Sequence, residues 1–233
     1  MIKKILFFVS FLPLILYSQA FSKLAFYKQA LKKNANDEKQ FQLQQELVNI
    51  YRIYNPDSCL FYTKKNFGLI RKNEWNPKKG RALLGLVSYY TEKNNIKSAY
   101  KYNQESFKIN KDNKDQSALA DNYYMFARLY HQKGEHAQAV RNYLKSIDVG
   151  TQSNNLWIVC SAYRSLAFLY LDESNKEKSY ENINKALKIA NKSNLLEASG
   201  FCYGVLGEID RSFGNAKEAQ LNFLKSYQYF KFT

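Results

Sequence analysis

Two histidines come closest, in this 233-residue sequence, to a pattern for metal or proton chemistry. His131 and His136 lie five residues apart and flank a glycine. Two ligands on one helix need a spacing of three or four residues to face the same ion. The carboxylates Glu92, Asp172 and Glu208 stand among lysines, which is typical of surface charges. We therefore predict no metal site and no acid–base pair.

The familiar catalytic motifs are also missing from the sequence. It contains no GxxxxGK phosphate loop, no GxGxxG dinucleotide loop, no HExxH zinc motif and no GxSxG nucleophile motif. These observations predict a protein without catalytic residues and without a cofactor. Its function should then depend on how its elements are arranged.

A repeat with a forty-residue period dominates that arrangement. One set of small side chains recurs at Cys59, Ala99, Ala139, Ser179 and Ala219, and a second set at Asn66, Ser106, Ser146, Ala186 and Ser226. A period held over five copies is typical of units that stack on one another. Apolar residues follow helical spacing, and only nine glycines and three prolines interrupt them. The sequence therefore predicts an all-α fold, a right-handed α-solenoid of antiparallel helix pairs.

Polar turns divide the chain into expected units. We expect an N-terminal helix at 21–36 that caps or half-completes the first repeat. The expected helix pairs are 37–72, 78–112, 116–150, 155–192 and 195–233. Asp37 is expected to cap the first helix of the first pair, and Asp57 or Ser58 the second. Gly134 and Gly214 occupy the point where a left-handed residue ends a helix.

Interhelical packing explains the residue types of the repeat. Small residues at Ala127, Ala167 and Gly207 should allow the two helices of one pair to approach closely. Large residues are expected to fill the space between one pair and the next, namely Tyr130, Tyr143 and Phe223. Because no pair can bury its own apolar stripe, stacking of the pairs is obligatory.

Three cysteines do not form a redox or zinc motif. Cys59 takes the position that alanine fills in the next two repeats, so we predict a small buried side chain. Cys160 and Cys202 lie near the starts of two successive first helices. Their offset from the forty-residue spacing is two positions, over half a turn, whereas a disulfide needs converging Cβ atoms. The offset disfavours a disulfide, but pairing remains open.

The first twenty residues have the pattern of a secretory signal peptide. Two lysines precede an apolar run at 5–17, which is shorter than the about 20 residues that span a bilayer. Small side chains at Ser18 and Ala20 suit cleavage before Phe21. We expect an exported protein, periplasmic or extracellular, with no membrane span after cleavage. Retention of residues 1–20 as an anchor is the alternative.

The formal charge of +15 raises the question of an anionic partner. Lysines occur in every expected helix and form no single block, which favours a solvated surface over a nucleic-acid site. We therefore expect no nucleic acid to bind this chain.

The repeat resembles a known family. In the third and fifth pairs the matching residues are Tyr123, Phe126, Ala127, Tyr130, Gly134, Ala139, Tyr143 and Ser146, then Leu206, Gly207, Gly214, Ala219, Phe223 and Ser226. These residues resemble the tetratricopeptide repeat (TPR) signature, and the resemblance covers nearly all of the chain after the signal peptide. The usual repeat has thirty-four residues, so this is a longer form. With a signal peptide it is similar to exported sensor regions of bacterial histidine kinases and transcriptional regulators.

The resemblance implies a groove lined by the first helix of each pair. Carried over to this sequence, the peptide-binding residues are Tyr124, Arg128, His131, Arg164, Phe168, Leu171, Phe201, Glu208 and Arg211. Arginines grip carboxylates or main-chain oxygens and aromatic rings cover apolar side chains, a mixture that suits an extended peptide.

Two functions are open on this basis. The first is a non-catalytic exported scaffold that binds a protein or peptide, as the sensor part of a signalling protein that lacks its output domain. The second is a structural scaffold of the cell envelope that acts through oligomer contacts. The last helix, with aromatic residues up to Phe232, indicates either a truncated product or an end that pairs with another chain as a homo-oligomer. A plain frayed terminus is the third reading.

Overall fold

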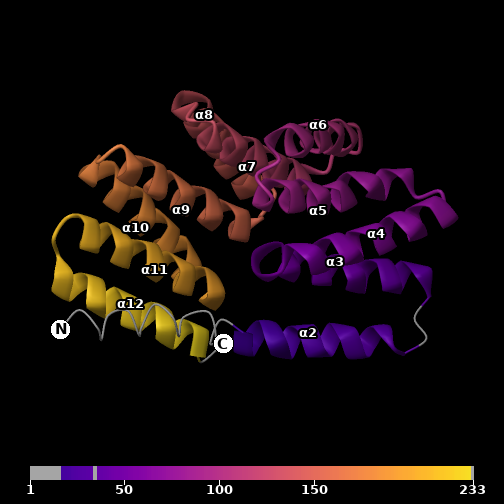
Figure 1. Cartoon of the computed structure of the whole chain (residues 1–233), viewed down its shortest axis with the longest axis horizontal. Helices are drawn as coiled ribbons and strands as arrows, with labels where there is room; N and C mark the ends of the chain where they lie inside the picture. The colour runs from indigo at the N-terminus through magenta and orange to yellow at the C-terminus, as the bar shows by residue number, and fades with distance from the viewer. Residues whose placement is uncertain (1–16, 34–35, 232–233) are drawn as a thin grey trace. The chain divides into compact units, whose positions relative to one another are not determined.

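The structure is a computed structural model that describes residues 17–33 and 36–231 (Figure 1). Most of the predicted signal peptide and the residues Phe232 and Thr233 lie outside this part of the chain. Residues 17–20 form the start of the first described helix. Cleavage before Phe21 therefore stays a prediction.

Every regular element in the described residues is a helix, and the helices follow one another in pairs. The bounds are α2 (Tyr17–Leu31), α3 (Asp37–Tyr54), α4 (Pro56–Lys72), the 3-10 turn η1 (Asn76–Lys78), α5 (Lys79–Glu92), α6 (Ile96–Asp112), α7 (Gln116–Gln132), α8 (His136–Gln152), α9 (Leu156–Asp172), α10 (Lys176–Lys192), α11 (Leu196–Ser212) and α12 (Ala216–Lys231). The first helices of the pairs are α3, α5, α7, α9 and α11. The all-α prediction, a solenoid of antiparallel helix pairs, is confirmed.

The chain forms two compact parts, one containing residues 23–154 and the other residues 155–233. Within each part, helices pack first within their pair and then on the next helix along the chain. First helices also contact one another, since α5 touches both α3 and α7, and α9 touches α11. Among the described residues, no helix combines the length and the apolar character that a membrane span requires.

A turn that recurs every twenty residues joins the helices. Each turn contains one residue with positive φ, and these residues are Glu74, Asn94, Lys114, Gly134, Asn154, Ser174, Asn194 and Gly214. The residue after it donates its backbone N–H to a carbonyl five residues back, as Asn95 does to Tyr90 at 2.8 Å. This is the Schellman arrangement, which satisfies carbonyls at the helix end. The forty-residue sequence repeat therefore consists of two helix–turn units of equal length.

The residue that closes one helix often starts the next. Asn95 is also the N-cap of α6, where its side chain accepts a hydrogen bond from the backbone N–H of Ser98 at 3.0 Å. The expected caps of the first pair were wrong by one to three residues. Asn36 caps α3 and Asn55 caps α4, with Pro56 at the first helical position. Proline there fits because its missing N–H has no helical partner anyway.

Glycine and serine allow the close approach that the repeat needs. A Cβ atom added to Gly207 would lie 2.8 Å from the Phe223 ring, so this ring packs inside its own pair. Phe223 was expected between pairs, and that expectation is wrong. Tyr130 does pack across pairs, against Tyr100 of α6. In three pairs a serine hydroxyl of the second helix donates to a first-helix carbonyl at 2.8 Å, namely Ser106 to Gly80, Ser146 to Ala120 and Ser226 to Gly200.

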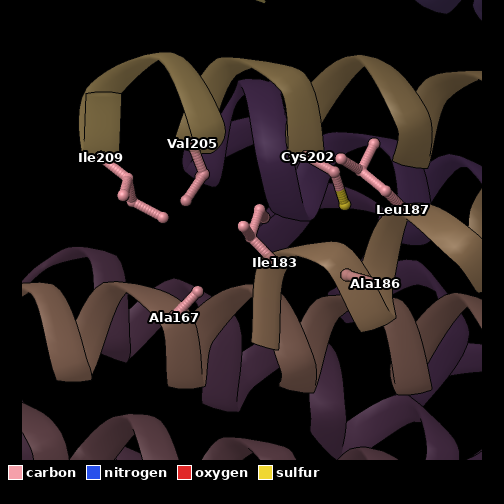
Figure 2. Close-up of a cluster of buried hydrophobic side chains, with 7 residues drawn as sticks. All are labelled: Ala167, Ile183, Ala186, Leu187, Cys202, Val205 and Ile209. Carbon is pink, nitrogen blue, oxygen red and sulfur yellow. The ribbon is translucent and has the colours of Figure 1, made fainter. Parts of the chain in front are cut away.

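Apolar residues from three successive helices form the core of the part containing residues 155–233 (Figure 2). The cluster consists of Ala167 from α9, of Ile183, Ala186 and Leu187 from α10, and of Cys202, Val205 and Ile209 from α11. Full burial of one large aliphatic side chain stabilises a fold by about 1.5–3 kcal/mol. Because α10 contributes to both neighbours, this cluster joins the fourth pair to the fifth.

The interior between α6 and α7 is polar instead. Asn122 donates from Nδ2 to Asn103 Oδ1 at 2.8 Å and to Ser106 Oγ at 2.9 Å. Asn110 donates to Asn122 Oδ1 at 2.8 Å, and all four side chains are fully buried. Buried amides are costly unless they are paired, so this network should hold the two helices in one register.

Two glycines make a matched test of helix approach. A Cβ atom at Gly85 would lie 2.1 Å from Thr63 Oγ1 and 3.1 Å from Val48, whereas nothing lies within 4 Å of one at Gly68. We expect Gly85→Ala to lower the free energy of unfolding by about 1–3 kcal/mol through overpacking. Gly68→Ala should raise it by about 0.5–1 kcal/mol, because alanine favours a helix. Urea titrations of both variants measure the difference, and equal effects would contradict the packing described.

Candidate functional site

Helix α7 carries the first three of the expected site residues. Tyr124 packs against Tyr143 of α8, with 5.8 Å between ring centroids, and against the apolar cluster below it. Arg128 donates from Nη2 to Glu92 Oε1 of α5 at 2.9 Å and remains partly exposed. His131 stands edge to face with His136 across the turn, at 5.7 Å. Of these three, Arg128 is the charged group with a defined geometry at the surface.

A second arginine, Arg52, links three first helices of the same part. Its Nε donates to Ser88 Oγ of α5 at 2.8 Å, and its Nη1 lies 3.4 Å from Asp121 Oδ1 of α7. Nη2 approaches the sulfur of Met125 at 3.9 Å. The side chains of Arg52 and Asp121 are 17% and 18% exposed. Arg52 therefore ties α3, α5 and α7 together while one edge of its guanidinium faces solvent.

The two arginines lie on one surface, which we call the first-helix face of residues 23–154. Glu92, the partner of Arg128, follows Ser88, the partner of Arg52, by four residues on α5. Four residues are about one helical turn, so these two acceptors are neighbours on α5. The face therefore presents two guanidinium groups, each beside an acceptor from a neighbouring first helix.

The part containing residues 155–233 holds the remaining six expected residues. Arg164 of α9 lies over the Phe201 ring of α11 at 4.8 Å, and Trp157 meets the same ring edge to face. These three residues line a shallow surface crevice between α9 and α11 that encloses no space for a water molecule. The crevice is therefore a patch of two aromatic rings and a guanidinium group at the surface, and not a pocket for a small ligand.

The other four residues of this part do not converge on the crevice. Phe168 is exposed, whereas Leu171 packs on the apolar cluster of Figure 2. Glu208 and Arg211 form an ion pair within α11, at 2.5 Å. Because Arg211 is well exposed, that pair adds little to stability. The structure therefore joins Arg164 to Phe201 and Glu208 to Arg211, and it assigns Leu171 a packing role.

The sequence-based site omitted Arg52, Ser88, Asp121 and Trp157. A signal for three of them was available, because applying the family's groove positions to every pair also selects Arg52, Ser88 and Asp121. Nothing in the sequence indicated that one arginine would reach across 69 residues to an aspartate. Trp157 precedes the expected positions and carries no sequence signal of its own.

The described residues form neither a metal site nor a reactive thiol. They contain no group of three or more His, Cys, Asp or Glu side chains placed to hold a metal ion. Cys59, Cys160 and Cys202 are buried free thiols. Burial raises the pKa of Cys59 and of Cys160 to about 11, and that of Cys202 to about 12. A thiolate is the reactive form, so these cysteines are inert near neutral pH.

Comparison with known proteins agrees with this architecture. A family model described as the SusR N-terminal TPR domain matches residues 17–91. The apo form of RapI superimposes with a TM-score of 0.57 at 12% identity, covering 91% of this chain and 92% of that one. No curated protein matches the sequence.

Two larger proteins also share the fold. For aspartyl phosphate phosphatase F from Bacillus subtilis the TM-score is 0.64 at 15% identity, with 86% of this chain and 54% of that chain covered. For a signal transduction ATPase with a tetratricopeptide repeat sensor from Pyrococcus horikoshii it is 0.57 at 20% identity, with 86% and 32% covered. This chain thus spans about half of the former and a third of the latter.

The repeat, the helix pairs and these matches together define the class of protein. Residues 17–91 match the SusR N-terminal TPR family, and the chain has the fold of tetratricopeptide repeat proteins. Its fold is of the type that serves as a scaffold for protein binding.

The Arg52 contacts predict a measurable loss of stability. Arg52→Ala leaves the buried Ser88 hydroxyl and the largely buried Asp121 without this donor, and should lower the free energy of unfolding by about 1–3 kcal/mol. Arg211→Ala removes a pair whose arginine is 67% exposed and should change it by about 0.5 kcal/mol or less. Thermal and urea unfolding compare the two, and similar losses would refute the role given to Arg52.

Thiol labelling tests the buried cysteines. Because burial raises their pKa from 9.0 to about 11 or 12, the thiolate fraction at pH 8 is lower in the folded protein than in the unfolded one. We expect slow alkylation by iodoacetamide at pH 8, rising only as the pH approaches 11, and rapid alkylation in urea. Mass spectrometry counts the modified sites. Rapid labelling of Cys160 in the folded protein at pH 8 would contradict its burial.

Proposed function

We propose that this chain is an exported, non-catalytic TPR scaffold that binds a peptide or protein on its first-helix faces, as the sensor part of a signalling protein. The observation that carries the proposal is the pair of arginines, Arg52 and Arg128, on the first-helix face of residues 23–154. Each already binds an acceptor of a neighbouring helix. A partner's carboxylate or main-chain oxygens would find two preorganised donors on this face.

The part containing residues 155–233 adds a site for a different kind of group. The crevice between Arg164, Phe201 and Trp157 offers two aromatic rings and a guanidinium. Buried aromatic and arginine anchors dominate many protein interfaces. Each part would therefore bind its own segment of an extended partner, the first through charge and the second through an apolar or aromatic side chain.

Two observations support the sensor role and export. The apolar run at 5–17, with small residues before Phe21, has the pattern of a signal peptide. One structural neighbour is described as carrying a tetratricopeptide repeat sensor. The identity to that neighbour is low, so its other activities are not transferred to this chain.

One observation favours a second function, a structural scaffold that assembles through its last helix. Leu221 and Leu224 of α12 are 52% and 43% exposed and lie three residues apart on one face. Exposed apolar pairs of this kind can form an oligomer contact. A defined dimer or larger assembly of the purified protein by light scattering, lost on Leu221→Lys, would favour this second function, whereas a monomer would count against it.

Peptide selection followed by binding measurements tests the first function. The purified protein is used to select from a random peptide library, and each selected peptide is labelled with fluorescein for anisotropy titrations. We expect Arg128→Ala to weaken binding by at least about tenfold, the equivalent of about 1.4 kcal/mol, because a charged hydrogen bond is lost. Arg141→Ala, an exposed arginine on the second helix α8, is the matched control and should bind normally.

Two results would overturn the proposal. Failure to enrich any peptide over an unrelated helical protein would remove its basis. Equal affinity of wild type, Arg128→Ala and Arg164→Ala would show that the selected peptides bind outside the first-helix faces.

A further inference from the structure

The positive charge of the chain is distributed unevenly between its two parts. Residues 23–154 contain 23 Lys and Arg against 12 Asp and Glu, a net charge of +11. Residues 155–233 contain 10 against 8, a net charge of +2. The excess that looked evenly spread along the sequence therefore belongs almost entirely to one part of the fold.

Within that part, the second helices α4 and α6 carry nearly half of the excess. Together they carry eight Lys and Arg and three Asp and Glu. The buried side of α6 is formed by Ala99, Asn103, Ser106 and Asn110. At 100° per residue, Lys97, Lys101 and Lys108 lie on the opposite side of the helix. The basic residues of α6 therefore point away from the body of the protein.

Helix α4 repeats this arrangement. Its buried side contains Cys59, Thr63, Asn66 and Ile70, so Lys64 and Arg71 lie on the far side. Lys93, in the turn before α6, forms an ion pair with Asp57 at the start of α4, at 3.2 Å. This ion pair brings the N-terminal ends of α4 and α6 close together. We call their combined outer surface the α4–α6 face.

Most described cations of the α4–α6 face are exposed and form no ion pair. Within the described part of the chain, no ion pair forms to Lys64, Arg71, Lys97, Lys101, Lys108 or Lys111. Some other lysines of this part do form ion pairs, as Lys79 does with Glu105. Lys97 to Lys111 spans fourteen residues, about 21 Å at 1.5 Å per residue. The like charges along such a row repel one another, and an anionic surface laid against them would relieve that repulsion.

An exposed aromatic ring lies among these cations. Phe61 of α4 is 52% exposed, and Lys65 Nζ stands 4.7 Å from its ring centroid. On α2, in the same part, Phe26 is 64% exposed. Aromatic rings beside lysines are the mixture that binds at the boundary of headgroups and acyl chains. Phosphate clamps on nucleic acids favour arginine, and seven of the eight cations here are lysines.

We propose that the α4–α6 face binds the surface of an anionic phospholipid bilayer, with the lysines at the headgroups and Phe61 at the acyl boundary. The first-helix residues Arg52 and Arg128 lie on other helices of the same part. The bilayer would therefore be bound without occupying the peptide-binding face. The proposal is independent of the function proposed above.

Sedimentation with vesicles tests this proposal on the full chain. We expect binding to vesicles of phosphatidylcholine mixed with phosphatidylglycerol and none to phosphatidylcholine alone. Each lysine near an anionic surface contributes about fivefold to partitioning. Lys101→Gln/Lys108→Gln should therefore weaken binding by about 25-fold, and salt of about 1 M, where the Debye length is about 3 Å, should abolish it.

The control removes the same charge from the other part. Lys188→Gln/Lys192→Gln lies on α10, the second helix of the fourth pair, and should bind vesicles nearly as well as wild type. Phe61→Ser leaves the charge unchanged, and it should also weaken vesicle binding relative to wild type. The selected peptides of the previous section should bind the α6 variant with unchanged affinity.

Three outcomes would overturn the proposal. The absence of binding to anionic vesicles would refute the proposal directly. Equal losses in the α6 and α10 variants would show that net charge alone attracts the protein. Salt-sensitive retention on duplex DNA without vesicle binding would assign the face to nucleic acid instead.

Discussion

The reversal of the chain every twenty residues is the constraint on which the rest of this structure depends. At each reversal from the end of α4 onward one residue adopts the left-handed conformation, and the following backbone N–H closes the helix end. Only Gly134 and Gly214 adopt it without a Cβ penalty, whereas residues such as Lys114 and Ser174 do so at a cost of about 1–2 kcal/mol. Packing of the pairs offsets that cost. The constant twenty-residue spacing of these turns then aligns equivalent residues of successive pairs.

Two kinds of interior hold the pairs together. Between α10 and α11 most of the contact is apolar, and apolar burial has no preferred geometry. The Tyr180 hydroxyl adds a directional contact there, because it donates to the buried Asp210 Oδ1 at 2.6 Å. Between α6 and α7 buried asparagines form a network that fixes one register, because each amide requires its partner. The fold thus combines non-directional apolar stacking with directional hydrogen bonds. Arg128 lies on α7, whose register the asparagine network holds more firmly than a purely apolar contact would.

The two faces of residues 23–154 differ in how their charge is balanced. On the first helices, Arg52 and Arg128 are held by acceptors of neighbouring helices and form a preorganised surface. On the second helices, lysines such as Lys101 and Lys108 point outward without acidic partners. A paired arginine favours specific, short-range recognition, and unpaired lysines favour diffuse attraction to an extended surface. One stack of helix pairs can therefore present two binding surfaces of different chemistry.

The sequence by itself determined the helical class, the repeat and much of the buried surface. The buried positions of Ala139, Ser146 and their counterparts could be predicted because stacking demands a small residue at the same place in every pair. Contacts across pairs could not be predicted from the sequence. Arg52 meets Asp121 only because three first helices lie together, and Cys160 and Arg164 share a crevice only because α9 touches α11. Local periodicity is encoded residue by residue, whereas the partners of a charge depend on distances between segments that only the tertiary structure sets.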